Sequence, residues 1–232
     1  MIPLKDDNPT GSFPFITITI IIANILIFIL QVISEGGDVQ LSAQFALIPV
    51  RFTSDIPVVI NSQTDFVINP FFTLITYAFL HGGIGHLAFN MLFLWIFGNN
   101  IEDALGHIKF IFFYVLCGVG AALLHLVMNL DSSALMVGAS GSIAGVLGAY
   151  LILYPHAHIH TLFLFIFIIR IIKVPAVFFI GFWFFIQIMS VVGGGGGSTA
   201  WYAHIGGFIV GLILIMAMKP KKKKKHLNIV YH

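Results

Sequence analysis

The sequence predicts an all-α polytopic membrane protein, built as a bundle of six transmembrane helices with both termini in the cytoplasm. Of its 232 residues, 59% are hydrophobic and 9% are charged, whereas a soluble globular domain carries about 25% charged residues. Long segments without any charge recur along the chain, and a spanning helix needs about 20 residues. The basic residues between these segments fall almost entirely on one predicted side of the membrane, which sets the orientation.

The gaps between charged residues delimit the predicted helices in order. The first and third segments each accommodate one helix, and the first is too long for the apolar region of a typical signal peptide. The second holds a loop followed by a helix from about Gly85. The fifth is interrupted by "VVGGGGGSTA" and predicts two helices, near residues 174–192 and 202–218. The charge-free segments are 15–34, 66–101, 110–130, 132–169 and 174–218.

The fourth segment is ambiguous because a proline and a histidine cluster divide it. Residues 138–154 fit one helix. The nine residues Thr161–Ile169 would make a helix of only about 14 Å, too short to cross about 30 Å of hydrocarbon. A longer helix would bury Arg170 and Lys173 at a cost of about 2.5–3.5 kcal/mol each. We therefore predict residues 156–173 as an interfacial or re-entrant connection, which leaves six spans.

The predicted domains are a cytoplasmic N-terminal tail (1–14), a six-span membrane domain (15–218) and a basic cytoplasmic C-terminal tail (219–232). With both termini inside, ten of the 11 Lys and Arg residues face the cytoplasm and only Arg51 faces outward. This bias follows the positive-inside rule. The lysine run in the C-terminal tail is typical of a simple anchor at the end of a span, with specific lipid recognition as the alternative.

Polar residues near the starts of three predicted helices share one depth in the membrane. Helices two, four and six all run from the outside to the inside in this topology. His86 and Asn90 lie at the start of helix two, Ser140 at the start of helix four, and His204 at the start of helix six. All four are therefore expected near the outer face, a short way into the membrane.

Two stripes of small residues predict which helices lie side by side, because small residues allow close backbone approach between membrane helices. If the stripes face each other, Ser140 and His204 come within reach, and the imidazole can take the proton of the hydroxyl. No carboxylate follows Asp131, so we expect a Ser-His dyad rather than a triad. The stripes are Ser140, Ala144 and Gly148 in helix four and His204, Gly207 and Gly211 in helix six.

A site for the oxyanion of acyl transfer is the second requirement of this chemistry. His86 and Asn90 are four residues apart, so both project from one face of helix two and can donate hydrogen bonds. Ser140 opens a helix, where backbone N–H groups lack partners within the helix. Each residue also has a simpler interpretation: a packing serine, a polar link between helices, or, for His204, a proton relay or ligand.

These residues carry a resemblance to the rhomboid intramembrane serine proteases. The matching stretches are "HGGIGHLAFNMLFLWIFGNNIEDALG" from His81, "GASG" around Ser140 and "AHIGGFIVG" from Ala203. Their order and spacing fit the family over roughly residues 70–218. The resemblance implies a rhomboid-like bundle that acts as an intramembrane serine endopeptidase, without a cofactor or a metal ion.

The resemblance also implies roles for the site residues. Ser140 would be the nucleophile and His204 the general base. His86 and Asn90 would help the Ser140 N–H to hold the oxyanion. The glycines expected to shape the site are Gly138 and Gly141, in the turn that exposes the hydroxyl, and Gly207, in the stripe of helix six.

The expected partners follow from the same resemblance. Substrates would be single-span membrane proteins, cut near the outer end of their span, and the lipid bilayer would surround the protein. No nucleic acid is expected. The expected location is the plasma (inner) membrane, with the active site near its outer face. Glu102 matches the acidic residue that the family carries after helix two, where we expect a structural role.

Several alternatives stay open at this point. Ser142 competes with Ser140 as the nucleophile. The protein could be an inactive rhomboid-like binder of membrane proteins, or a small transporter that uses the polar residues as a path. A zinc protease is disfavoured because no HExxH motif is present. The glycine run 193–197 suggests a mobile cap over the site, or merely a tolerated loop.

Overall fold

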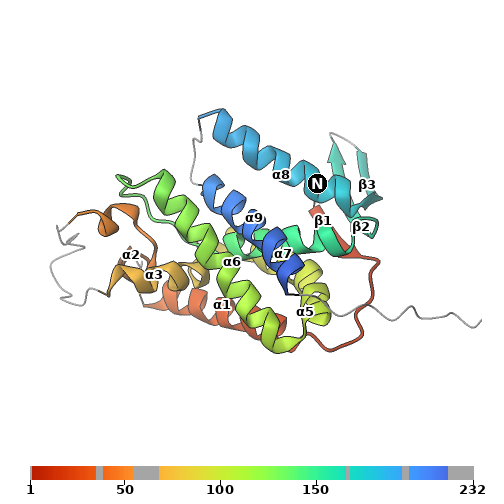
Figure 1. Ribbon diagram of the computed structural model, residues 1–232, viewed down its shortest axis with the longest axis horizontal. Coiled ribbons are helices and arrows are strands. Elements are labelled where there is room, and N and C mark those ends of the chain that lie inside the picture. Colours follow the sequence, from red (N-terminus) through yellow and green to blue (C-terminus); the bar gives the residue numbers. More distant parts are fainter. Residues whose placement is uncertain (1, 35–38, 55–67, 166–167, 195–198, 219–232) are drawn as a thin grey trace, which may run out of the picture.

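Helices make up most of the protein (Figure 1). The computed structural model describes residues 2–34, 39–54, 68–165, 168–194 and 199–218. The longer helices are α1 (Phe15–Ile33), α4 (Ile84–Phe93), α6 (His107–Met128), α7 (Ser140–Leu153), α8 (Ala176–Val192) and α9 (Trp201–Ala217). The shorter ones are α2 (Val39–Phe45), α3 (Pro70–Thr76), α5 (Asn99–Leu105) and the 3-10 turns η1 (Pro49–Phe52) and η2 (Tyr77–Phe79). A π-helical turn, η3 (Leu94–Gly98), joins α4 and α5 into one helix.

Three helices of the described chain are long and apolar enough to cross a membrane: α1, the continuous helix Ile84–Leu105, and α6. Helices α7, α8 and α9 are apolar but shorter, with 14, 17 and 17 residues. That length corresponds to about 21–26 Å of helix. Every predicted spanning segment therefore contains an apolar helix. The protein is an integral membrane protein, while six complete spans and the orientation of the termini stay predictions.

A three-stranded antiparallel sheet at one end of the bundle corrects the all-α prediction (Figure 1). Strands β2 (His158–Phe165) and β3 (Ile168–Pro175) form a hairpin, and β1 (Ile2–Asp6) of the N-terminal tail pairs with β2. The segment predicted as an interfacial or re-entrant connection is this hairpin. Its strands are rich in β-branched and aromatic residues, which have high β propensity. Strand pairing also satisfies backbone groups that an irregular connection would leave unpaired.

Glycines set the close contact between α7 and α9. A Cβ atom at Gly207 would collide with the carbonyl group of Gly141, and one at Gly211 would collide with Gly145. The backbones of the two helices therefore touch along this line, as small-residue stripes allow. Helix α7 is the most enclosed helix of the group, since every residue from Gly141 to Tyr150 is buried.

The stripe predicted on helix four differs from the one that the structure uses. The predicted stripe consists of Ser140, Ala144 and Gly148. In the structure, Gly141 and Gly145 occupy the first two contact positions and Gly148 keeps the third. The physical reason is that glycine has no Cβ atom, so these positions allow a closer approach than serine or alanine would. The stripe of α9, by contrast, faces α7 as expected.

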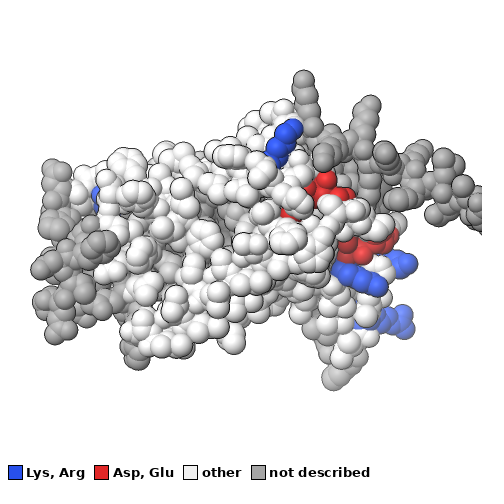
Figure 2. Space-filling view, turned by 90° about the horizontal axis from the view of Figure 1, so that it is seen from below, with Lys and Arg blue, Asp and Glu red and all other residues white. Residues whose placement is uncertain are grey.

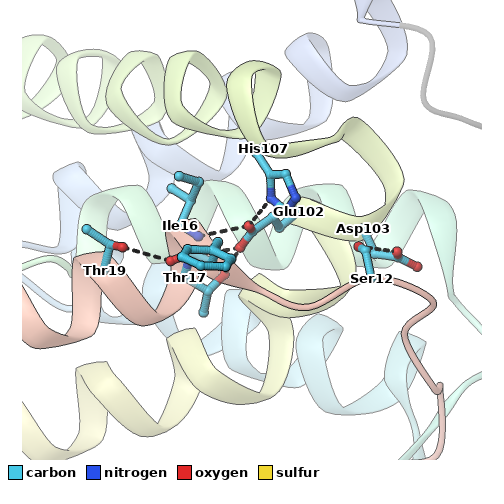
Figure 3. A network of polar contacts seen from close by, with 8 residues as sticks. Ser12, Ile16, Thr17, Thr19, Glu102, Asp103 and His107 are labelled. Carbon is cyan, nitrogen blue, oxygen red and sulfur yellow. Dashed lines mark hydrogen bonds and ion pairs between the residues drawn. The ribbon is translucent and has the colours of Figure 1, made fainter.

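Glu102 of α5 caps the first turn of α1, although the two lie far apart in the sequence (Figure 3). Its carboxylate oxygens accept hydrogen bonds from the backbone N–H groups of Ile16 and Thr17, each at 2.8 Å. The Thr17 hydroxyl donates to it at 2.7 Å and His107 Nδ1 lies 2.6 Å away. Helix α1 has no capping side chain of its own, so Glu102 supplies the partners that a helix start lacks.

Charged side chains are confined largely to one end of the molecule. In the face that Figure 2 shows, the acidic and most basic side chains gather toward the end that carries the sheet in Figure 1. The rest of the described surface in this view is almost free of charge. Large apolar side chains point outward along the helices, for example Ile33, Phe112 and Phe178. Such a surface suits lipid rather than water.

Candidate active site

Ser140 and His204 meet at the contact between α7 and α9. Helix α7 begins at Ser140, and His204 lies in the first turn of α9. The Ser140 Oγ and His204 Nε2 atoms are 2.8 Å apart, which is hydrogen-bonding distance. The bare backbones at Gly141 and Gly207 bring the helix starts this close. The structure thus places together the two residues that the sequence singled out.

The other side of the His204 ring contacts α8. Its Nδ1 atom lies 2.8 Å from Oε1 of Gln187, and Nε2 of Gln187 donates to the Trp183 carbonyl at 2.8 Å. The Trp183 indole lies beside the imidazole, with ring centroids 5.7 Å apart. Gln187 is not among the residues predicted from the sequence. A signal was present, because Gln187 is the only amide side chain in the apolar segment 176–192.

His86 and Asn90 face Ser140 from α4. His86 Nδ1 accepts a hydrogen bond from the Gly82 N–H at 3.4 Å, so a neutral ring carries its proton on Nε2. The Nδ2 atom of Asn90 is buried and has no partner among the described residues. Two donors are therefore free for a ligand at this place.

Gly138, two residues before Ser140, lies next to these donors. A Cβ atom at Gly138 would lie 2.7 Å from His86 Nε2 and 3.5 Å from Asn90 Nδ2. Its φ angle is +119°, a region that favours glycine. The backbone N–H of Ser140 begins α7 and has no partner within the helix. The three groups predicted to hold an oxyanion therefore lie around one turn.

A cavity of about 820 Å³ opens onto this turn. Its lining contains all four polar residues predicted for the site, together with further polar residues from α6, from α9 and from the loops next to them. It also contains apolar side chains of α4, α7 and α8. The polar lining residues include His86, Asn90, His125, Asn129, Ser132, Ser140, Thr199, Tyr202 and His204. The cavity is large enough to take a peptide segment.

The same part of the chain matches a known family. Residues 69–221 match the family described as Rhomboid domain, which is more than half of the 232 residues. The chain belongs to the rhomboid family. All of the predicted site residues lie inside the matched region, from His86 to Gly207.

Curated relatives of this rhomboid include proteins named as proteases. Rhomboid protein 1, mitochondrial, of Saccharomyces cerevisiae is 32% identical over 161 residues, covering 65% of this chain and 42% of the relative. Rhomboid protease AarA of Providencia stuartii is 30% identical over 151 residues, covering 60% and 52%. Rhomboid protease GluP of Bacillus subtilis is 42% identical over 78 residues, covering 34% and 15%. The chain spans about half or less of the length of these relatives.

Ser142, the competing nucleophile of this rhomboid chain, points elsewhere. It is 1% exposed, and its Oγ lies against α6, 2.5 Å from the position that a Cβ of Gly118 would take. It does not line the cavity. The geometry around Ser142 therefore offers no access for a substrate, in contrast to Ser140.

Metal ligands and the glycine run were also considered from the sequence, and the described residues bear on each of them differently. Within the described ranges, the structure contains no group of three or more His, Cys, Asp or Glu residues that could hold a metal ion. The single cysteine, Cys117, is buried between helices.

The suggested cap at 193–197 lies outside the described residues beyond Gly194. The basic tail 219–232 lies outside them as well.

Proposed function

We propose that this rhomboid is an intramembrane serine endopeptidase with a Ser140–His204 dyad. One observation carries the proposal: the 2.8 Å contact between Ser140 Oγ and His204 Nε2, beside a cavity in an apolar helical bundle. A serine hydroxyl is a weak nucleophile unless a base removes its proton. Neutral imidazole at hydrogen-bonding distance is a suitable base.

In the first step, His204 Nε2 takes the Ser140 proton while Oγ bonds to the carbonyl carbon of the scissile peptide. The carbonyl π bond breaks and its electron pair moves to oxygen. The Ser140 N–H, His86 Nε2–H and Asn90 Nδ2–H donate to this oxyanion. Donors that are fixed in a water-poor site stabilise such a charge more than water does.

The intermediate then collapses with loss of the amine. His204 transfers its proton to the leaving nitrogen as the C–N bond breaks, which leaves an acyl group on Ser140. A water molecule, deprotonated by His204, attacks that ester in turn and releases the acid product and the free hydroxyl. The reaction needs no cofactor.

We propose single-span membrane proteins as substrates. A peptide bond inside a helix has its carbonyl group hydrogen-bonded and shielded, so the scissile segment has to leave its helix before attack. Residues with low helix propensity near the cleavage site lower the cost of that step. In the predicted topology the cleavage occurs near the outer end of the substrate's span, in the plasma (inner) membrane.

A fluorophosphonate probe tests the proposal on purified protein in detergent, with intact mass as the readout. We expect one adduct on the wild type and on Ser142→Ala, and none on Ser140→Ala or His204→Ala. Ser142→Ala is the matched control, because it removes a hydroxyl from the same helix without touching the cavity. Labelling of Ser140→Ala, or an unlabelled wild type, would contradict the proposal and favour a rhomboid-like binder that does not cleave.

A further inference from the structure

We propose that Gln187 is a positioning residue that fixes His204 in the tautomer required for proton transfer from Ser140. The inference rests on the proposed function, since it concerns the same dyad. It extends the pair into an ordered chain of hydrogen bonds that starts at the backbone of α8 and ends at the serine hydroxyl.

The direction of each hydrogen bond follows from the first one. The Trp183 carbonyl can only accept, so the group of Gln187 that faces it at 2.8 Å is the amide NH2. The amide oxygen of Gln187 therefore faces His204 Nδ1 at 2.8 Å. That oxygen can only accept, so Nδ1 carries the proton of the neutral ring. His204 Nε2 then has a free lone pair to accept the Ser140 Oγ–H at 2.8 Å.

Burial makes this arrangement strongly favoured over the alternative. Gln187 is 3% exposed and His204 is 9% exposed. With the opposite tautomer, the Gln187 oxygen would face a bare nitrogen lone pair, and Nε2–H would face the serine oxygen. His204 Nδ1 and Gln187 Oε1 would then lose their hydrogen bond to each other in an apolar interior, which is costly. The serine would also have no base to accept its proton.

The indole of Trp183 limits rotation of the imidazole. Trp183 and His204 have ring centroids 5.7 Å apart, and Trp201 approaches the ring edge-on at 6.2 Å. One helix, α8, thus supplies both the amide that orients the ring and an aromatic face that packs against it. Gln187 plays the part that a carboxylate plays in a triad, but without a charge.

The titratable groups around His204 are other imidazoles. His86 of α4 and His125 of α6 line the same cavity as His204. Neither imidazole is the hydrogen-bond partner of His204 Nδ1 in the wild type, because Gln187 occupies that position. A carboxylate introduced at position 187 would be a new kind of partner for His204, which makes it an informative substitution.

Kinetics of purified variants on a membrane-peptide substrate test the inference. We expect Gln187→Leu to lower kcat by about 10- to 100-fold with little change in KM, less than the loss of general acid–base catalysis itself, because His204 remains in place. Gln187→Glu keeps an acceptor at Nδ1 and favours the imidazolium. It should therefore recover most of kcat at alkaline pH, and the acidic limb of the pH profile should move to higher pH. Ser190→Ala, the other polar position of α8, is the control and should match the wild type.

Nitrogen-15 NMR of histidine-labelled protein gives a readout that does not depend on activity. The His204 signals are identified by their absence in His204→Ala. We expect the Nδ1–H form in the wild type and a loss of that preference in Gln187→Leu. An Nε2–H form in the wild type, or wild-type kcat and pH profile in Gln187→Leu, would overturn the inference. A wild type without probe labelling but with Nδ1–H would refute the proposed function and leave the positioning of His204 standing.

Discussion

Gly138, two residues before the proposed nucleophile Ser140, determines whether the proposed oxyanion donors can reach the site. Its N–H donates to the Tyr77 carbonyl at 2.9 Å, and this hydrogen bond fixes the loop segment that precedes α7. Its φ of +119° and the closeness of His86 Nε2 leave no room for a side chain. Both constraints act at one position, so a single methyl group should disturb backbone and donors together.

Gly138→Ala is therefore expected to reduce kcat by about 100-fold or more, the loss typical of removing an oxyanion donor. The methyl group would displace the His86 ring and strain the backbone. Probe labelling and peptide cleavage measure the effect. Gly181→Ala is the matched control, since a Cβ there meets no atom within 4 Å. Wild-type activity in Gly138→Ala would show that the contact with His86 does not matter.

At the scale of one element, α1 is arranged the opposite way from a helix of a soluble protein. Its buried residues are all polar: Thr17, Asn24 and Gln31. Its apolar side chains point outward, toward the predicted lipid. Gln31 bonds the backbone N–H of His81 at 3.1 Å and Thr17 bonds Glu102. Because lipid provides no hydrophobic drive to bury apolar residues, polar contacts hold such a helix to its neighbours.

Glu102→Gln should lower the free energy of unfolding by about 1–3 kcal/mol. The amide keeps one oxygen, but its NH2 group would face the N–H donors of α1 that the carboxylate now accepts. Unfolding in detergent with increasing denaturant measures the change. Asp103→Asn is the matched control, because Asp103 is less buried and bonds Ser12 at an exposed place. Probe labelling of the folded fraction should stay unchanged, since Glu102 does not line the cavity. Equal stability of Glu102→Gln and wild type would contradict the capping role.

At the scale of the whole molecule, the distribution of charge agrees with a membrane protein whose sheet lies outside the bilayer. Strand β3 carries Arg170 and Lys173, and β1 carries Lys5. Arg51 lies in η1, toward the opposite end of the molecule (Figure 1). A chain with this bias is expected to keep the sheet on the cytoplasmic side.

Cysteine accessibility tests this orientation. We expect a membrane-impermeant maleimide to label Thr53→Cys in intact bacterial cells, and to label Lys173→Cys only after the cells are permeabilised. The native Cys117 is buried and provides the unlabelled background. Labelling of Lys173→Cys in intact cells would reverse the predicted orientation, and with it the outer position of the site.

Much of the site could be predicted because its signals are local. Ser140, His204, His86 and Asn90 stand out as polar residues in apolar segments, and a common depth follows from the order of the helices. The structure brings Ser140 and His204 into contact at 2.8 Å. Gln187 also stands out as the only amide side chain in the apolar segment 176–192, but the sequence does not show that it contacts the histidine. Gln187 contacts His204 only because α8 packs against α9, and no spacing rule connects two separate helices.

The sequence by itself determined the apolar helices, because hydropathy and the lack of charge are properties of each segment alone. It did not determine the sheet, since β1 and the hairpin it joins lie more than 150 residues apart. Tertiary structure also decided that α7 meets α9 through Gly141 and Gly145. These features depend on which surfaces come together, and many small contacts between distant residues set that choice rather than any local pattern.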